Sequence, residues 1–154
     1  KRDLSSYRGD VLDEVTQDHL ELGKFQQLIA ASDNDAYNAL IAADLGPEVG
    51  HDRIVRIAPN ANAPVKGRGR VLMASAPSAD ELLNRHAAGW TFSRTRMTDK
   101  FGYADYRANL HGGGEAVAVL KPDKRLLPFT SDARPVVEPG DVVIGYLPPT
   151  PLPA

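Results

Sequence analysis

The residues best suited to bind a ligand gather in one short turn, Ser32-Asp33-Asn34-Asp35, which follows the apolar residues 28–31. Open α/β sheets bind ligands where their parallel strands end, so these oxygen-bearing side chains could contact the ribose of a nucleotide or a partner domain. The same residue types cap helices, because their side chains accept hydrogen bonds from the first free backbone N–H groups. We favour the capping role, since capping alone accounts for the composition.

Gly9-Asp10 and Asn38 are two further features that could bind a ligand or support the fold. Gly9-Asp10 could touch the edge of an adenine ring, or it could form a strand-to-helix turn in which Asp10 is the cap. Asn38 lies one turn inside the helix that follows the polar turn, where asparagine is a poor interior residue. We predict that Asn38 bonds to the loop backbone and braces the turn, and we assign no catalytic role to any of these residues.

The remaining residues that could do chemistry are scattered along the chain. His19, His51, His86 and His111 form no pair at i, i+4 spacing, and there is no H-E-x-x-H motif, no G-x-S-x-G elbow and no cysteine. We therefore expect no catalytic residue, no metal site and no enzymatic activity. A small hydrolase is kept as a further hypothesis, and it requires the fold to gather histidine and carboxylate side chains that are distant in the sequence.

Composition points to an ordinary globular chain. Of its 154 residues, 42% are hydrophobic and 25% are charged, which suits one domain or two small ones with a packed core. The net charge of −2 argues against a nucleic-acid partner, and the basic residues 66–70 suit a solvated loop. No apolar run approaches the roughly 20 residues needed to cross a bilayer, and no signal peptide is visible at Lys1-Arg2-Asp3. Because the chain opens without an initiator methionine, we expect it to be part of a longer protein.

The elements that must position the polar turn alternate between helix and strand. Apolar spacing predicts a helix through residues 12–22 that stops at Gly23, and then a buried parallel strand at residues 25–31. Asp33 or Asn34 should cap the next helix, which Gly46-Pro47 should end. An alternating strand is predicted at residues 53–59.

The second part of the chain follows a different pattern. We expect a linker at residues 59–70, followed by a helix at residues 79–87 with Ser78 as its cap and Glu81 at the capping-box position. Residues 100–107 suggest an interface or a strand with one buried face. Four short strands are predicted, the last after the turn Pro139-Gly140-Asp141, and a proline-rich tail follows: 91–95, 115–120, 126–130 and 142–147, with the tail at 148–154.

The predicted fold class is therefore α/β, with a partial Rossmann-like parallel sheet followed by a small, mainly antiparallel β module. The predicted divisions are residues 1–60 for the α/β unit, 61–88 for a linker and helix, and 89–154 for the β module and its tail. Half of a Rossmann unit leaves an open strand edge and an uncovered apolar face, and such surfaces invite pairing. We therefore expect a homodimer.

A family resemblance is carried by Gly9-Asp10 and by residues 28–38. They resemble the second half of the regulator-of-conductance-of-potassium domain, the cytosolic Rossmann-like module of potassium channels and transporters. The sequence of residues 31–40 and 52–59 is most similar to the C-terminal region of bacterial sodium:proton antiporters that carry such a domain. Residues 89–92 and 139–144 resemble the β module that follows it there.

The resemblance implies a non-catalytic regulatory domain on the cytoplasmic face of the inner membrane, joined to the membrane antiporter domain of the same chain. The family's G-x-G-x-x-G fingerprint is absent, so we expect an incomplete nucleotide site and no cofactor. The alternative is a nucleotide-binding regulatory domain of a potassium channel or uptake system, truncated at its N-terminus. In that case Gly9, Asp10, Ser32, Asp33 and Asn34 would bind an adenine nucleotide or NAD.

Overall fold

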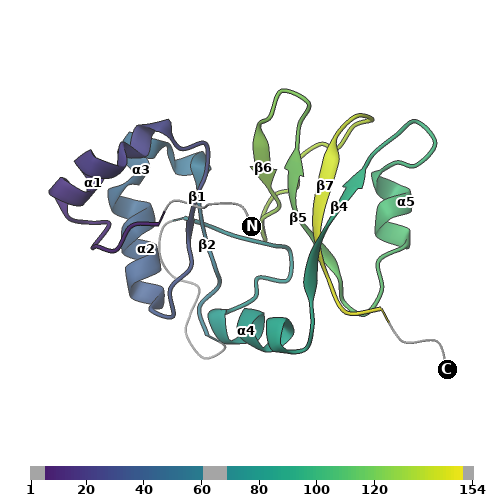
Figure 1. The fold of residues 1–154 in the computed structure, drawn as a ribbon, viewed down its shortest axis with the longest axis horizontal. Helices are drawn as coiled ribbons and strands as arrows, with labels where there is room; N and C mark the ends of the chain where they lie inside the picture. Colours follow the sequence, from purple (N-terminus) through teal and green to yellow (C-terminus); the bar gives the residue numbers. More distant parts are fainter. Residues whose placement is uncertain (1–5, 61–68, 151–154) are drawn as a thin grey trace.

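Two β-sheets make up the centre of the molecule, as seen in a computed structural model that describes residues 6–60 and 69–150 (Figure 1). The first sheet is parallel, with strand order β1-β2-β3, and the second is antiparallel, with order β4-β7-β5-β6. The predicted fold class, a parallel α/β unit followed by a mainly antiparallel β module, is confirmed. The elements of the parallel unit are α1 (Glu14–Leu20), η1 (Leu22–Lys24), β1 (Leu28–Ala30), α2 (Asp35–Asp44), α3 (Gly46–Val49), η2 (His51–Arg53), β2 (Ile54–Arg56) and β3 (Arg70–Val71).

The antiparallel module follows α4 (Ala79–Ala87) and matches the predicted strands closely. Its elements are β4 (Thr91–Arg96), α5 (Tyr103–Ala108), β5 (Glu115–Leu120), β6 (Leu126–Pro128) and β7 (Val142–Leu147). The turn before β7 forms as predicted, because the buried carboxylate of Asp141 accepts the backbone N–H of Glu138 at 2.7 Å and Gly140 takes a positive φ of 94°. Of the predicted tail, residues 148–150 have no regular structure, and the rest lies outside the described residues.

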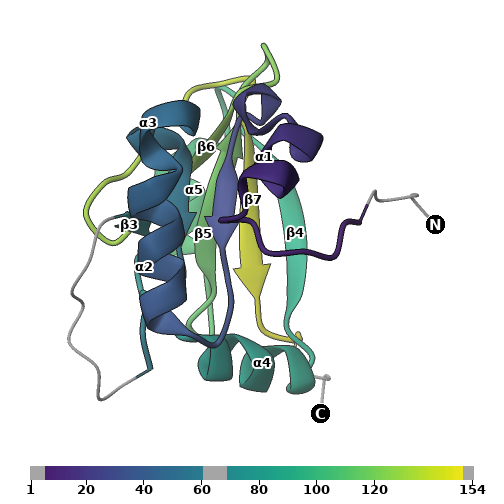
Figure 2. The same ribbon diagram turned by 90° about the vertical axis from the view of Figure 1, so that its left-hand side faces the viewer.

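The two sheets lie side by side, with helices on their outer sides. Figure 1 shows α1, α2 and α3 on the side of the parallel strands that faces away from the antiparallel sheet, and α5 on the far side of the antiparallel sheet. Figure 2 shows α4 lying across one end of both sheets. Each sheet therefore has one face covered by helices and the other turned towards its neighbour.

A shared apolar cluster fills the space between the sheets. Val55 of β2 and Tyr146 of β7 belong to it and are 0% and 4% exposed, and Trp90 packs against it from the chain before β4. Its other members are Leu72, Met73, Leu82 and Val117. Two separate clusters lie on the outer faces, one beneath α2 and α3 and one beneath α5.

The strand predictions in the parallel sheet need correction. The predicted strand at residues 25–31 is only β1, and it is not buried on both faces, since Phe25 is 47% and Ile29 is 50% exposed. β2 does not alternate between buried and exposed residues, because Ile54 packs beneath the helices while Val55 packs against the antiparallel sheet. As the central strand, β2 is covered on both faces, which is typical of parallel sheets.

The strand β3 and the helix α5 also differ from the predictions. β3 begins at Arg70, the last residue of the predicted linker, and it forms because its backbone pairs with β2 on one side and Ser131 donates to the carbonyl of Val71 at 2.9 Å on the other. Residues 61–68, which include most of the predicted basic patch, lie outside the described residues. The segment around residues 100–107 forms the helix α5, in which Tyr106 is buried against the antiparallel sheet.

Helix boundaries also differ from the predictions. α1 begins only at Glu14, because Asp13 caps it, and its residue Val15 is 74% exposed. Gly46-Pro47 does not simply end α2. It begins the short helix α3, since proline fits the first turn of a helix, where its missing N–H costs nothing.

The predicted cap of α4 is confirmed, but the predicted capping box is not. Ser78 accepts the backbone N–H of Glu81 at 3.3 Å. The carboxylate of Glu81 instead pairs with Arg85, whose guanidinium also lies 3.0 Å from Glu115 of β5. Arg85 lies over the ring of Trp90 at 4.9 Å, so these contacts fix α4 to the shared cluster.

Candidate functional site

The polar turn after β1 is held together by its own side chains. Asn34 caps α2 by accepting the backbone N–H of Tyr37 at 3.0 Å, which identifies Asn34 rather than Asp33 as the cap. Asn38 is completely buried, and its amide oxygen accepts the backbone N–H and the hydroxyl of Ser32 at 3.0 and 2.8 Å. Its amide nitrogen donates to the carbonyl of Ser32 at 2.8 Å. The predicted bracing role of Asn38 is confirmed.

Asp10 lies beside this turn although it is distant in sequence. Its carboxylate accepts the hydroxyl of Tyr37 at 2.6 Å and the backbone N–H of Leu12 at 3.0 Å. The hydrogen bond from Tyr37, followed by that from Leu12, lowers the pKa of Asp10, and the same bond raises the pKa of Tyr37. Asp10 is not a helix cap as the alternative interpretation proposed, because Asp13 caps α1.

The structure thus brings most of the predicted site residues together through Tyr37. The backbone of Tyr37 binds Asn34, its hydroxyl binds Asp10, and Ser32 belongs to the same turn. Gly9 lies against the ring of Tyr7, where an added Cβ would come within 2.5 Å of that ring. Asp33 is exposed and makes no hydrogen bond within the described residues. These hydrogen bonds account for the polar residues of the turn without any ligand. A nucleotide contact at this turn stays a prediction.

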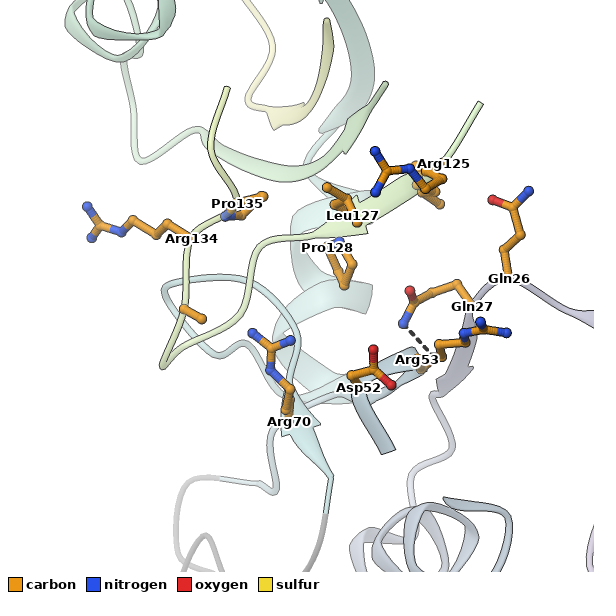
Figure 3. Close-up of a pocket in the computed structure, with 12 residues that line it drawn as sticks. Gln26, Gln27, Asp52, Arg53, Arg70, Arg125, Leu127, Pro128, Arg134 and Pro135 are labelled. Carbon is orange, nitrogen blue, oxygen red and sulfur yellow. Dashed lines mark hydrogen bonds between the residues drawn. The ribbon is translucent and has the colours of Figure 1, made fainter. Parts of the chain in front are cut away.

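The opposite end of the parallel sheet holds a cavity that the sequence did not predict. It has a volume of about 630 Å³ and lies where β1, β2 and β3 begin, facing β6 and the chain that follows it (Figure 3). Its walls come from both sheets. The lining residues are Gln26, Gln27, Asp52, Arg53, Arg70, Arg125, Leu126, Leu127, Pro128, Ala133, Arg134 and Pro135. We call this cavity the arginine cleft.

Positive charge dominates the arginine cleft, since its lining has four arginines and one carboxylate. Arg70 is held in place, because its guanidinium donates to the hydroxyl of Thr130 at 2.9 Å and lies 3.7 Å from the carboxylate of Asp132. The pKa of Asp132 is lowered, chiefly because its carboxylate accepts a hydrogen bond from the hydroxyl of Thr130. Burial opposes this shift, and the positive charge of Arg70 adds to it. Arg125 pairs with Asp123 at 2.7 Å.

Arg53 differs from these two. Within the described residues its side chain makes no ion pair, and its backbone carbonyl accepts the amide of Gln27 at 2.6 Å (Figure 3). No spacing rule connects residues 53, 70, 125 and 134, which lie at the start of β2, at the start of β3 and around β6. The cleft therefore could not be predicted without knowing which strands adjoin.

The histidines do not form a shared site. His19 lies against the ring of Tyr7, with ring centres 5.1 Å apart, and His51 packs over Gly46, where an added Cβ would overlap its ring. In the described ranges 6–60 and 69–150, no group of three or more His, Asp or Glu side chains could hold a metal ion. None of the helices described here is both long enough and apolar enough to cross a membrane.

Comparison with known proteins adds little to this description. No protein-family model matches the chain, and no curated protein matches it. Among solved structures, the chain is similar to the crystal structure of the GsuK RCK domain, with 17% sequence identity and a TM-score of 0.31. The match covers 90% of this chain and 34% of that one, so the chain spans about a third of the matched protein. A similarity of this size carries no argument about family or function.

The bracing role of Asn38 can be measured directly. We expect Asn38→Ala to lower the free energy of unfolding by about 2–3 kcal/mol, because it leaves the part-buried backbone groups of Ser32 without partners. The matched control Asn34→Ala removes one exposed cap and should lower it by about 1 kcal/mol. Urea denaturation of both variants provides the comparison, and equal losses would show that Asn38 is not a specific brace.

Proposed function

We propose that this chain is the cytoplasmic regulatory region of a bacterial sodium:proton antiporter and that it acts without catalysis. The proposal is based on the sequence resemblance, which extends from Gly9-Asp10 through residues 28–59 to residues 139–144. The observed order of elements, a parallel α/β unit followed by a small antiparallel module, agrees with it. Such a region regulates transport only if it interacts differently with two states of the transporter.

The structure adds one observation that supports an interaction with a partner, namely the open edge of the parallel sheet. β1 pairs with β2 on one side only, within the described residues, and its three residues form a short edge. Leu28 and Ala30 pack beneath the helices, whereas Ile29 points to the opposite face and is 50% exposed. Val55 lies beside Ile29 in register and is covered by the antiparallel sheet, which does not extend over β1. An exposed edge with an apolar residue is suited to pairing with another chain or segment.

The test of this function uses the complete transporter in inverted membrane vesicles. We expect removal of residues 1–154 to leave sodium-driven proton movement in place and to change its dependence on pH or on a regulatory ligand. The measurement is the fluorescence of a pH-sensitive dye during addition of sodium. If transport has the same dependence with and without this region, the chain is not its regulator.

Dimer formation is a separate part of the proposal. We expect a second copy of the chain to cover β1, because β1 has an open edge and Ile29 adds apolar surface beside it. Light scattering at micromolar concentration should then report a dimer for the natural chain and a monomer for Ile29→Lys. The control Val136→Lys places the same charge at a residue that is 73% exposed in a loop, and it should leave the dimer intact.

The dimer proposal fails if the natural chain is a monomer. It also fails if Ile29→Lys and Val136→Lys dissociate the dimer to the same extent, because the effect would then reflect charge rather than the edge of the sheet.

A second candidate function is a nucleotide-binding regulatory domain of a potassium system. The position of the Ser32–Asn34 turn at the carboxyl end of β1 favours it, since ligands bind there in open α/β sheets. Calorimetry with NADH distinguishes the two candidates. Tight binding that Asp33→Ala weakens would support this alternative and would contradict an incomplete site.

A further inference from the structure

The arginine cleft has the size and the wall composition of a small-molecule site. Its volume of about 630 Å³ lies within the range of known ligand pockets, roughly 300–1,000 Å³. Such pockets combine apolar walls with a few convergent polar groups, and they occur preferentially where two structural units meet. Here one wall comes from the parallel sheet and the other from β6 and the following chain.

The polar groups of the cleft favour an anion. In Figure 3, Arg53 and Arg70 stand on the side of the parallel strands and their side chains point apart, Arg125 lies along β6, and the guanidinium of Arg134 points away from all three. Arg53 and Arg125 are exposed, so both side chains are free to turn towards a ligand. Asp52 is the one carboxylate in the lining, and Asp123 and Asp132 each engage one arginine from outside it. The side chain of Arg53 has no counter-ion among the described residues, so positive charge remains available to a ligand.

Guanidinium chemistry narrows the class of anion. Arginine presents a planar set of donors that matches phosphate and carboxylate oxygens in pairs. Arg70 is pre-oriented by Thr130, and this orientation lowers the entropy that a bound anion would have to offset. Three arginines from separate segments offer more hydrogen-bond donors than a single carboxylate can accept, whereas a phosphate group has enough oxygens to accept them.

The apolar part of the lining indicates an organic rather than an inorganic phosphate. Leu126, Leu127, Pro128 and Pro135 form it, and in Figure 3 the labelled members of this set lie on the β6 side of the cleft. An inorganic anion would leave this surface unused. A nucleic acid fits poorly, because the chain as a whole carries a net charge of −2 and the arginines are confined to one cavity.

We propose that the arginine cleft binds a small organic phosphate. The pre-oriented Arg70 would hold the phosphate, the exposed side chains of Arg53 and Arg125 would turn towards it, and the leucine and proline side chains would contact the apolar part. The site lies at the amino ends of the parallel strands, opposite the Ser32–Asn34 turn. Because its walls belong to both sheets, the bound phosphate would connect β2 and β3 to β6. This inference is independent of the proposed function, because it depends only on the residues that line the cleft.

The test is calorimetric titration of the chain with ADP and with inorganic pyrophosphate, at low and at moderate salt. We expect ADP to bind with a dissociation constant below about 1 mM at low salt, and binding to weaken as salt screens the arginines. ADP should bind more tightly than pyrophosphate, because only ADP can use the apolar wall. Failure of ADP to bind, or binding of ADP no tighter than that of pyrophosphate, would overturn the assignment.

Substitutions of single arginines show where ADP binds. Arg53→Gln and Arg125→Gln should each weaken ADP binding by roughly tenfold, since each removes a charge-assisted hydrogen bond to the phosphate. Both side chains are exposed and hold no distant element in place, so both variants should fold. The control Arg94→Gln removes an equal charge from the exposed side of β4, away from the cleft, and should bind ADP like the natural chain.

Two results would contradict the location. Equal weakening in Arg94→Gln would show that only net charge matters. Weakening by Asp33→Ala, with Arg53→Gln unaffected, would place the nucleotide at the turn after β1 instead.

Discussion

The packing of Val55 against the antiparallel sheet is the interaction on which the rest of the structure depends. Val55 is fully buried in the central strand of the parallel sheet, and it joins Tyr146, Leu72 and Met73 in a cluster between the two sheets. Backbone bonds reinforce the contact, since Met73 donates to the carbonyl of Phe129 at 2.8 Å. Three parallel strands of two or three residues have too few neighbours to be stable alone, so their second face needs this partner.

The same packing determines where ligands could bind. It closes the face of β2 and β3, holds β6 opposite the starts of the parallel strands, and so creates the arginine cleft. At the other end α4 is fixed to the cluster through Arg85, Trp90 and Glu115. β1 lies beyond the antiparallel sheet and keeps one apolar face open. The two surfaces for which binding is proposed therefore differ in kind: one is a charged cleft between the sheets, and the other is an apolar edge outside them.

Local interactions were predictable from the sequence, and distant ones were not. The cap at Ser78, the brace at Asn38 and the turn at Asp141 each depend on residues within six positions of one another, so residue type and spacing were sufficient. β3 was missed because it is defined by pairing with segments distant in the chain. The helix α5 does carry a local signal, since the backbone N–H of Gly102 donates to the carboxylate of Asp105 at 2.8 Å, but its mixture of aromatic and charged residues was interpreted as an interface or a strand. Glu81 was assigned to the wrong partner, because nothing in the spacing distinguishes the backbone of Ser78 from the guanidinium of Arg85. The arginine cleft could not be predicted, because its lining residues come from segments that are distant in the chain.

Cooperativity between the two sheets is the most direct test of this account. The chain has a single tryptophan, and Trp90 packs against the shared cluster. Its fluorescence therefore reports the packing between the sheets, while far-ultraviolet circular dichroism reports all the helices and strands. During denaturation by urea, we expect the two signals to show coincident transitions with one midpoint. A loss of the Trp90 signal at lower urea concentration, with the secondary structure intact, would show that the sheets are independent and would contradict this account.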